Sequence, residues 1–450
     1  MLDIKYIREN KELVKANVIT RGVDSSKADT DKLLKIDSEK NLLQKKIEEL
    51  RQKRNVLSKS KPTPEQIEEA KSFKTQIEEL EASYNKLNKE FTDIMLWFPN
   101  LSSGEMPEGK TSEDNIEIKA WRPDKGYLNK DEIGKGEFSG QFMPDYSLHS
   151  DSKFDLKDHV ELGKIHKIID VEQSAKVSGS RFTYLLGDAV RLQWALASHL
   201  NEKLLSEGWV PMVPPLMVKE RSLYGTSHFP GDADQVYSID SDKVEDKEKM
   251  YLVGSSEPSN FSYFMDKVMD EKELPFKVFA NTSCFRSEVG SWGKDVKGIK
   301  RVHQFDKLEI DVVCKEEESK EIHEYLLSIN EWLLQSLKLP YHIINMCKGD
   351  AGYYATYKKY DIEVWLPTGR KYIEVGSDTN AIDYQARRMN IKYRAKDGTL
   401  KYAHTVNDTG IPFGRMLICI LENYQQPDGS ILIPEVLQKY MGKDKLEVKS

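Results

Sequence analysis

The sequence predicts an α+β protein in which an N-terminal antiparallel α-helical coiled-coil hairpin precedes a domain built on an antiparallel β-sheet flanked by helices. Residues 31–96 carry apolar side chains at alternating spacings of three and four, as coiled coils do. From about residue 120, short strand-like segments follow one another with helices between only some of them, which favours antiparallel pairing. At 450 residues, with 39% hydrophobic and 31% charged content, the chain is long enough for two or three domains.

The hairpin is defined by two apolar series and a helix-start signal between them. Thr63, Pro64 and Gln66 supply an N-cap, a proline at the first helical position and a capping-box partner. Lys40 and Arg54 occupy the two seam positions of the first helix that lack an apolar residue. At 1.5 Å per residue each helix should be about 40–45 Å long. The apolar series are Leu33, Ile36, Leu43, Ile47, Leu50 and Leu57, and then Ala70, Phe73, Ile77, Leu80, Tyr84, Leu87, Phe91 and Ile94.

The first helix of this hairpin is rich in lysine and arginine. One interpretation is a solvated coiled-coil face, and the other is a grip on a phosphate backbone. Few aromatic residues are interleaved, so the pattern does not imply base stacking. The cations are Lys40, Lys45, Lys46, Arg51, Lys53, Arg54, Lys59 and Lys61.

After a linker at 97–109 the remaining elements can be placed from their patterns. Residues 187–209 form a long amphipathic helix, and 414–426 form a helix opened by glycine. Strand-like segments cover 275–288, 303–314, 359–367, 370–380 and 402–410.

Charged and aromatic residues share one face of two consecutive strands. Arg286 and Glu288 lie two apart, as do Arg301, His303, Phe305, Lys307 and Glu309, and the strand period of two puts each set on one face. Arginine suits phosphate or carboxylate, glutamate can accept from an exocyclic amine, and a phenylalanine ring can stack on a base. Structural salt bridges and a nucleotide site both remain open on this evidence. His303 is expected to be a hydrogen-bonded framework residue.

Three further groups could support chemistry. Glu374 and Ser377, placed at a strand end, are oxygen ligands of the kind that Mg²⁺ accepts. Asn407 and Thr409 are expected on one side of a turn. Arg415 opens an apolar helix against the helix dipole, so something anionic should hold it there. Ser255 and Glu257 alternate at another strand end, although in isolation a capped turn is the better interpretation of them.

Several function classes are disfavoured. The nine histidines and four separated cysteines show no zinc spacing, and no phosphate-binding glycine loop or catalytic triad is present. No apolar run is long enough for a membrane span, and the first residues lack a signal core, so we expect a cytoplasmic protein. The net charge of −7 means that a nucleic acid would have to meet a local basic patch.

On these residues the chain resembles the seryl-tRNA synthetases, a family of class II aminoacyl-tRNA synthetases, over nearly its whole length. The most specific stretches are 284–309 (motif 2), 414–442 (motif 3 and the C-terminal tail), 158–163 and 176–192. Residues 207–215 resemble motif 1, whose proline, Pro214 or Pro215, lies at the dimer interface in that family. The resemblance implies the bacterial and eukaryotic type rather than the zinc-dependent archaeal type.

The resemblance divides the chain into residues 1–110, a tRNA-binding domain with the arm at about 31–96, and 111–450, the class II catalytic domain. Expected tRNA contacts are Lys45, Lys46, Arg51, Lys53 and Arg54. The loop at 289–298 is expected to reach the tRNA acceptor end. Partners would be L-serine, tRNA(Ser) with its long variable arm, with tRNA(Sec) as a further candidate, and a second copy of the chain.

The resemblance also assigns the site, with ATP as substrate, Mg²⁺ as cofactor and no zinc. Arg286, Arg301 and Arg415 would be catalytic: Arg286 at the α-phosphate and the serine carboxylate, Arg301 and Arg415 at the γ-phosphate. Adenine would lie between Phe305 and Arg415, with its amino group at Glu288, and Glu374 and Ser377 would bind Mg²⁺. The full ATP set is Arg286, Ser287, Glu288, Arg301, Val302, Phe305, Glu374, Val375, Gly376, Ser377 and Arg415. The serine set is Ser255, Ser256, Glu257, Arg286, Glu309, Asn407 and Thr409, with Thr409 facing the hydroxyl.

Two departures from the family pattern concern the serine pocket. Ser255-Ser256-Glu257 stands where the family has Thr-x-Glu, and Asn407-Asp408-Thr409 stands where Asn-Gly-Ser is common. Both changes keep a hydroxyl, so the chemistry should survive while the pocket shape is in question. The segment 231–250 is longer and more acidic than the family pattern and is expected to form a surface hairpin.

Serine–tRNA ligation needs no side-chain nucleophile, because positioning and neutralisation of phosphate charge carry such transfers. This fits a pocket rich in arginine. Two alternatives are a homologue that loads serine onto a carrier protein and an inactive RNA-binding paralogue. The long basic arm argues against the first, and the intact set of charged pocket residues argues against the second.

Overall fold

The computed structural model describes residues 1–57, 63–128, 155–240, 248–290, 297–352 and 354–448. The chain divides into two compact units, Met1–Leu101 and Ser102–Ser450. Residues 102–110, which the sequence interpretation groups with the N-terminal domain, belong to the second unit.

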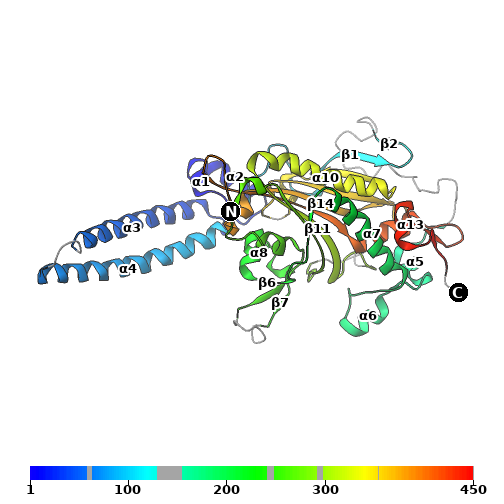
Figure 1. Cartoon of the computed structure of the whole chain (residues 1–450), viewed down its shortest axis with the longest axis horizontal. Coiled ribbons are helices and arrows are strands. Elements are labelled where there is room, and N and C mark those ends of the chain that lie inside the picture. Colours follow the sequence, from blue (N-terminus) through cyan, green and yellow to red (C-terminus); the bar gives the residue numbers. More distant parts are fainter. Residues whose placement is uncertain (58–62, 129–154, 241–247, 291–296, 353, 449–450) are drawn as a thin grey trace. The chain divides into compact units, whose positions relative to one another are not determined.

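The first unit is helical, and its two long helices form the predicted hairpin (Figure 1). Its helices are α1 (Ile4–Glu9), α2 (Lys11–Thr20), α3 (Thr30–Leu57) and α4 (Pro64–Met95). The capping box is confirmed: Gln66 N–H donates to Thr63 Oγ1 and Thr63 N–H donates to Gln66 Oε1. Residues 58–62, between the two helices, lie outside the described residues.

The two long helices run antiparallel with the predicted residues at their seam. Lys32 pairs with Glu90 at 2.8 Å, and Arg51 with Glu81 at 2.6 Å, so positions rise along α3 as they fall along α4. Every predicted seam residue is buried or half-buried. Lys40 occupies one of the two seam positions of α3 that lack an apolar residue. It donates to Asn88 Oδ1, and its Nζ lies 3.8 Å from the centre of the Phe91 ring. Burial lowers the pKa of Lys40, as expected for a cation at an apolar seam.

The second unit is built on a nine-stranded sheet, which confirms the predicted α+β class. Neighbouring strands are antiparallel except β10 and β5, which are parallel. In order, the strands are β2 (Gly126–Tyr127), β1 (Ile116–Arg122), β12 (Tyr341–Asn345), β13 (Lys358–Leu366), β14 (Lys371–Ile382), β17 (His404–Pro412), β11 (Gln304–Cys314), β10 (Phe276–Phe285) and β5 (Val210–Met212).

One face of this sheet packs against the hydrophobic core, and the opposite face carries polar side chains. Leu308, Ile310 and Val312 alternate along β11 and are fully buried in one apolar cluster with residues of α7, α10 and α12. The intervening Lys307 and Glu309 therefore face the opposite side. The helices of the unit are α5 (His159–Ile165), α6 (Val171–Ser178), α7 (Asp188–Ser206), α8 (Glu220–Thr226), α9 (Glu257–Ser262), α10 (Ser319–Ser336), α11 (Tyr384–Met389), α12 (Phe413–Asn423) and α13 (Glu435–Met441).

Small sheets complete the unit. β7 (Ser238–Ile239) pairs with β8 (Met250–Leu252) antiparallel, as expected for a hairpin at 231–250, but residues 241–247 lie outside the described residues. The other short strands are β3 (Ile169–Asp170), β4 (Tyr184–Leu185), β6 (Met217–Lys219), β9 (Val268–Asp270), β15 (Lys392–Arg394), β16 (Leu400–Tyr402), β18 (Ile431–Leu432) and β19 (Lys445–Leu446).

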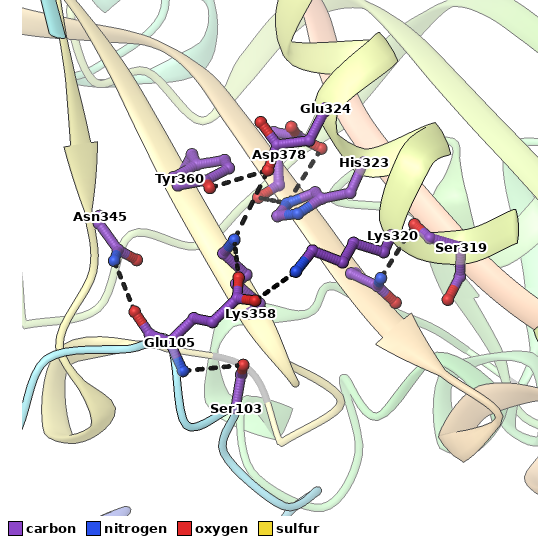
Figure 2. Close-up of polar contacts among 11 residues, drawn as sticks. Ser103, Glu105, Ser319, Lys320, His323, Glu324, Asn345, Lys358, Tyr360 and Asp378 are labelled. Atoms are coloured by element: carbon purple, nitrogen blue, oxygen red, sulfur yellow. Dashed lines mark hydrogen bonds and ion pairs between the residues drawn. The ribbon is translucent and has the colours of Figure 1, made fainter. Parts of the chain in front are cut away.

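The first residues of the second unit are anchored by one carboxylate. Glu105 makes ion pairs with Lys320 of α10 and with Lys358 of β13, the latter at 2.6 Å (Figure 2). Its carbonyl accepts from Asn345 at 2.8 Å. Lys320 and then Lys358 lower the pKa of Glu105 to about 2, so this segment is held by a carboxylate that stays ionised.

Within the described ranges, no helix is long and apolar enough to cross a membrane.

Candidate active site

The polar face of the sheet lines a cavity of about 410 Å³. Most of the predicted site residues are on its wall: Ser255, Glu257, Arg286, Glu288, Arg301, Val302, Phe305, Glu309, Glu374, Val375, Ser377, Asn407, Thr409 and Arg415. Eleven further residues complete the lining: Asp232, Ile299, Lys300, Lys307, Gly352, Ala355, Lys359, Thr379, Gln385, Pro412 and Gly414.

The wall formed by β11 confirms the period-two prediction for three of its five residues, while Arg301 and His303 precede the strand and His303 is not on the cavity wall. Phe305, Lys307 and Glu309 all line the cavity. Lys307 makes an ion pair with Glu309, and both side chains are almost fully buried. Burial disfavours a charged lysine, but Glu309 more than compensates, and the pKa of Lys307 is raised. Lys307 therefore keeps its positive charge inside the cavity.

The residues after β10 hold Arg286 and Glu288 in defined positions. Arg286 Nε donates to the Gly254 carbonyl at 3.0 Å, and its guanidinium carbon lies 5.4 Å from the centre of the Phe305 ring. A Cβ at Gly254 would come within 3.2 Å of Arg286 Cγ, so glycine allows this close approach. Glu288 has a φ of +49°, a strained value for a non-glycine residue. Its carbonyl accepts from Arg181 Nη1 at 2.9 Å, which helps to fix that conformation.

A β-bulge explains how Glu374 and Ser377 reach the same cavity although they are three residues apart. β14 pairs Gly376 with Ile362 and Glu374 with Glu363, so Val375 is the extra residue. Both residues lie inside β14, and the expectation that they mark a strand end was wrong. Glu374 is also the anion that holds Arg415: Arg415 Nη1 lies 3.4 Å from Glu374 Oε1 and donates to the Glu374 carbonyl at 3.0 Å.

Asn407 and Thr409 lie inside β17, which confirms the strand predicted over 402–410, and β17 runs directly into α12 where a turn was expected beside them. Pairing with β14 and β11 on either side holds this segment in the sheet. Glu309 and Thr409 are direct cross-strand neighbours. Asp408 points to the other face, where it accepts from the Ser377 N–H at 3.1 Å and from Asn330 of α10. Asp408, which stands where the family commonly has glycine, therefore does not alter the cavity wall.

The Ser255–Glu257 segment keeps its alternation in spite of the serine at 255. Ser255 and Glu257 line the cavity, while Ser256 points away and accepts from Asn260. Ser255 Oγ accepts from the Glu257 N–H at 3.2 Å. Glu257 begins α9 instead of ending a strand, and its carboxylate accepts from Gln385 at 2.6 Å.

The described wall of the cavity carries six cationic and five acidic side chains, so charge is nearly balanced. The cations are Arg286, Lys300, Arg301, Lys307, Lys359 and Arg415, and the acids are Asp232, Glu257, Glu288, Glu309 and Glu374. Arg301 and Glu288 form a pair at 3.5 Å, so ion pairing and an open cavity coexist here. Structural salt bridges and a binding site, the two interpretations that the sequence left open for this strand pair, are therefore compatible.

The acidic residues differ in how readily they ionise. Burial, followed by Glu309, raises the pKa of Glu257 to about 7, and burial with Asp234 raises that of Asp232 to about 6. Partial burial opposes ionisation of Glu374, whose side chain is 40% exposed, but Arg415, then Lys359, Arg286 and Arg301 outweigh it and the pKa of Glu374 is lowered. The Glu374 carboxylate is therefore ionised at neutral pH.

Three predicted residues are not on the cavity wall, each for a physical reason. Ser256 faces the protein interior. Ser287 Oγ donates to the Asp234 carbonyl at 2.6 Å. Gly376 meets the sheet interior, where a Cβ would come within 2.8 Å of Ile362 Cδ1. His303 is a framework residue, as predicted, with Nδ1 3.0 Å from the Arg286 carbonyl oxygen.

Some of the residues missed by sequence reasoning had a signal and others had none. Lys307 was placed on the period-two face with Phe305 and Glu309 but was given no role, and Thr379 could have been found because it follows Ser377 by two. Lys359 arrives by strand pairing with Thr379. Asp232 and Gln385 come from a loop and a helix whose approach to the sheet has no local sequence pattern.

The donor set suits Mg²⁺ that arrives with a phosphate ligand. Glu374 supplies an ionised carboxylate and Ser377 a hydroxyl, and Mg²⁺ commonly uses one or two protein oxygens together with substrate phosphates. The described residues contain no cluster of three or more His, Cys, Asp or Glu side chains arranged for a metal ion. The nearby cations would repel a metal ion unless an anion accompanied it.

Two family models match the chain. The model described as the seryl-tRNA synthetase N-terminal domain matches residues 1–102. The model described as the tRNA synthetase class II core domain (G, H, P, S and T) matches residues 237–424.

Curated relatives and solved structures agree with these matches. The serine–tRNA ligase of Dictyoglomus turgidum is 38% identical over 456 residues, covering 100% of both chains. That of Pyrococcus horikoshii is 39% identical over 456 residues, covering 98% of this chain and 96% of its own. The crystal structure of seryl-tRNA synthetase from P. horikoshii complexed with ATP aligns over 100% of both chains with a TM-score of 0.86 at 37% identity. The structure of cytoplasmic serine–tRNA ligase from Naegleria fowleri with AMP gives a TM-score of 0.81 at 27% identity, covering 100% and 99%.

Proposed function

The chain belongs to the seryl-tRNA synthetase family, and we propose that the cavity on the polar face of its sheet is where serine is activated by ATP. The family reaction joins serine to the 3′ end of tRNA through a seryl-adenylate, releasing pyrophosphate and AMP. The observation that supports this location is that Arg286, Arg301 and Arg415 line one cavity together with the Phe305 ring and with acidic and hydroxyl side chains. Such a set suits a nucleotide and a small zwitterion together.

The nucleotide half of the cavity is assigned as follows. Phe305 and Arg415 hold the adenine ring between them, and Glu288 accepts from its amino group. Arg286 binds the α-phosphate, and Arg301 and Arg415 bind the γ-phosphate of a bent ATP. The Arg301–Glu288 and Arg415–Glu374 pairs keep these arginines inside the cavity. Val302 and Val375 contribute apolar surface to the cavity wall.

The serine half lies over β11 and β17. Glu309 and Glu257 face the ammonium group, and Arg286 reaches the carboxylate. Ser255 and Asn407 complete the pocket, while Thr409 supplies the hydrogen bond to the substrate hydroxyl. A site that hydrogen-bonds this hydroxyl discriminates strongly against alanine and glycine, whereas threonine has to be excluded by size.

The chemistry then follows from charge and position. The serine carboxylate oxygen attacks the α-phosphorus in line, the bond to the β-phosphate oxygen breaks, and pyrophosphate leaves. Arg286 neutralises charge that develops at the α-phosphate, and Arg301 and Arg415 stabilise the leaving group. A hydroxyl of the tRNA 3′-terminal adenosine next attacks the seryl carbonyl, and AMP leaves. No side-chain nucleophile takes part.

Magnesium is the proposed cofactor, held by Glu374 and Ser377 together with the phosphates of ATP. When bound it neutralises phosphate charge and favours the bent form of ATP. Glu374 suits this role because four surrounding cations keep its carboxylate ionised. We also propose that the enzyme is of the bacterial and eukaryotic type without catalytic zinc. The match of the N-terminal model over 1–102 and the Glu257, Glu309 and Thr409 donor set of the serine pocket support that assignment.

We assign tRNA binding to the first unit and catalysis to the second. Lys45, Lys46 and Lys53 are exposed on α3 and offer their charges to a phosphate backbone. Arg54 is half-buried at the seam, and Arg51 is already paired with Glu81, so both contribute less. The proposed RNA partner is tRNA(Ser) with its long variable arm, and tRNA(Sec) is a further candidate substrate. The expected approach of the loop 289–298 to the acceptor end falls partly on residues 291–296, which lie outside the described residues.

A homodimer is proposed on the apolar surface around α7 and β5. Trp194 of α7 is 64% exposed and Val213 is 98% exposed, and Val210 and Leu205 are also open. Exposed large apolar side chains on these two consecutive elements are candidates for burial at an interface. Pro215 is exposed and Pro214 is buried, so Pro215 is the better candidate for the interface proline. A cytoplasmic location is proposed as well, in line with the relative from N. fowleri.

Two coupled assays test the proposed function. Serine-dependent exchange of pyrophosphate into ATP reports adenylate formation, and charging of a tRNA with a long variable arm reports transfer. We expect both activities. Exchange without charging, together with serine transfer to a carrier protein, would support the carrier-loading alternative. Absence of both activities with retained RNA binding would support the inactive paralogue.

A further inference from the structure

Gln385 of α11 is buried against the cavity and contacts three different elements. It is 1% exposed, yet it lines the cavity. Its Nε2 lies 2.6 Å from Glu257 Oε1 and 3.3 Å from the Thr226 carbonyl oxygen at the end of α8. Its Oε1 accepts from the hydroxyl of Thr405 on β17 at 2.6 Å. The family resemblance gave Gln385 no role.

These contacts fix which way the amide points. A backbone carbonyl can only accept a hydrogen bond, and so can an ionised carboxylate. Both therefore require the NH₂ end of Gln385, which leaves its oxygen for the Thr405 hydroxyl. If the amide were turned over, its oxygen would face the Thr226 carbonyl and an ionised Glu257. The arrangement is thus a directed chain from Thr405 through Gln385 to Glu257.

Glu257 depends on such a donor because its surroundings are poor for a charge. The side chain is 4% exposed. Burial and Glu309 raise the pKa of Glu257, and Asp311 of β11 adds a further acidic neighbour. Gln385, Lys307 and Arg286 act in the opposite direction, with the Gln385 hydrogen bond the largest of the three. Gln385 is neutral, so it stabilises the carboxylate without cancelling the negative charge that an ammonium group needs.

We propose that Gln385 is a positioning residue that orients the Glu257 carboxylate toward the ammonium group of the serine substrate and favours its ionised form. Thr405 supports Gln385 by donating a hydrogen bond to its amide oxygen, which locks the amide in this orientation. This inference rests on the proposed function, because it requires serine to occupy the cavity. It predicts that Gln385 acts on serine recognition and leaves ATP recognition alone.

The test uses Gln385→Met, which keeps the length of the side chain but removes its hydrogen bonds, and Thr405→Val, which removes only the lock. Gln438→Met on α13 is a matched control, because Gln438 is a half-buried glutamine that donates to the Ile433 carbonyl away from the cavity. Serine and ATP kinetics are measured by pyrophosphate exchange from about pH 6 to about pH 9, a range that includes neutral pH and both limbs of the expected profile.

Loss of a hydrogen bond to a charged group corresponds to about a 10- to 100-fold effect. We therefore expect Gln385→Met to lower kcat/KM for serine by about that factor at pH 7, with the KM for ATP within about twofold. Because the lost donor favoured the ionised form, the acidic limb of the serine profile should move to higher pH, and activity should recover toward pH 9. Thr405→Val should move in the same direction by less, and Gln438→Met should match the wild type.

A binding comparison removes any dependence on turnover. The probes are a non-hydrolysable sulfamoyl analogue of seryl-adenylate and the same compound without its amino group. Gln385→Met should weaken only the first, because the second offers nothing to Glu257. Equal losses for both probes, an unshifted pH profile or a raised ATP KM would each overturn the inference. A wild-type enzyme without serine-dependent exchange would instead refute the proposed function.

Discussion

Replacing Glu374 by glutamine should strengthen the binding of magnesium-free ATP and raise the magnesium concentration that the reaction requires. Glu374 Oε1 lies 3.4 Å from Arg415 Nη1. Coulomb's law gives about 1 kcal/mol for such a pair at the dielectric constant of water and about 5 kcal/mol at an effective value of 20. Because the Glu374 side chain is 40% exposed, solvent screening favours the lower end, about 1–2 kcal/mol.

That energy corresponds to about a 5- to 30-fold change in an equilibrium constant. Removing this negative charge frees Arg415 for the phosphates, so the Kd for ATP measured in EDTA should fall by about that factor. The same change removes a magnesium ligand, so the magnesium concentration giving half-maximal exchange should rise at least as much. Calorimetry in EDTA and magnesium titration of pyrophosphate exchange measure the two effects. Glu435→Gln, an exposed carboxylate of α13, is the control. Weaker ATP binding in EDTA, or an unchanged magnesium requirement, would refute this account of Glu374.

Three other predictions concern different parts of the chain. Arg181→Ala should raise the KM for ATP about tenfold and leave the KM for serine within about twofold, because Arg181 holds the strained backbone of Glu288. Equal changes in both KM values would contradict this. Replacing Lys45 and Lys46 by glutamate should raise the KM for tRNA about tenfold and flatten its salt dependence, and any loss of pyrophosphate exchange would count against a role confined to tRNA binding. Glu105→Gln should lower the Tm at pH 7. Since Lys320 and Lys358 depress the pKa of Glu105 from 4.5 to about 2, that difference should persist above pH 4.5 and shrink as the pH falls toward 2; a gap that is independent of pH would contradict it.

The arm and the β11 wall were predictable from sequence because local periodicity determines both. The spacings of three and four placed Lys40 and Arg54 at the coiled-coil seam, and the period of two placed Phe305, Lys307 and Glu309 on one face. Both patterns survive folding because each element has only one apolar side to bury.

Other features depend on contacts between distant segments, which local patterns do not contain. The turn expected beside Asn407 and Thr409 does not form, because strands on both sides hold this segment in the sheet as far as Pro412. Glu374 and Ser377 share the cavity only because of the bulge at Val375. Gln385 reaches Glu257 from a helix that lies 128 residues further along the chain.

The central claim is that serine is activated in this cavity, and single-turnover formation of seryl-adenylate by Arg286→Ala tests it most directly. The variant is compared with the wild type and with Arg221→Ala, an exposed arginine of α8 paired with Asp266, after circular dichroism shows all three to be folded. Removing one such charge-stabilising group costs about 100- to 1000-fold in comparable sites. We expect a loss of that size for Arg286→Ala and none for Arg221→Ala. Adenylate formation by Arg286→Ala within about threefold of the wild type would contradict the assignment of the active site to this cavity.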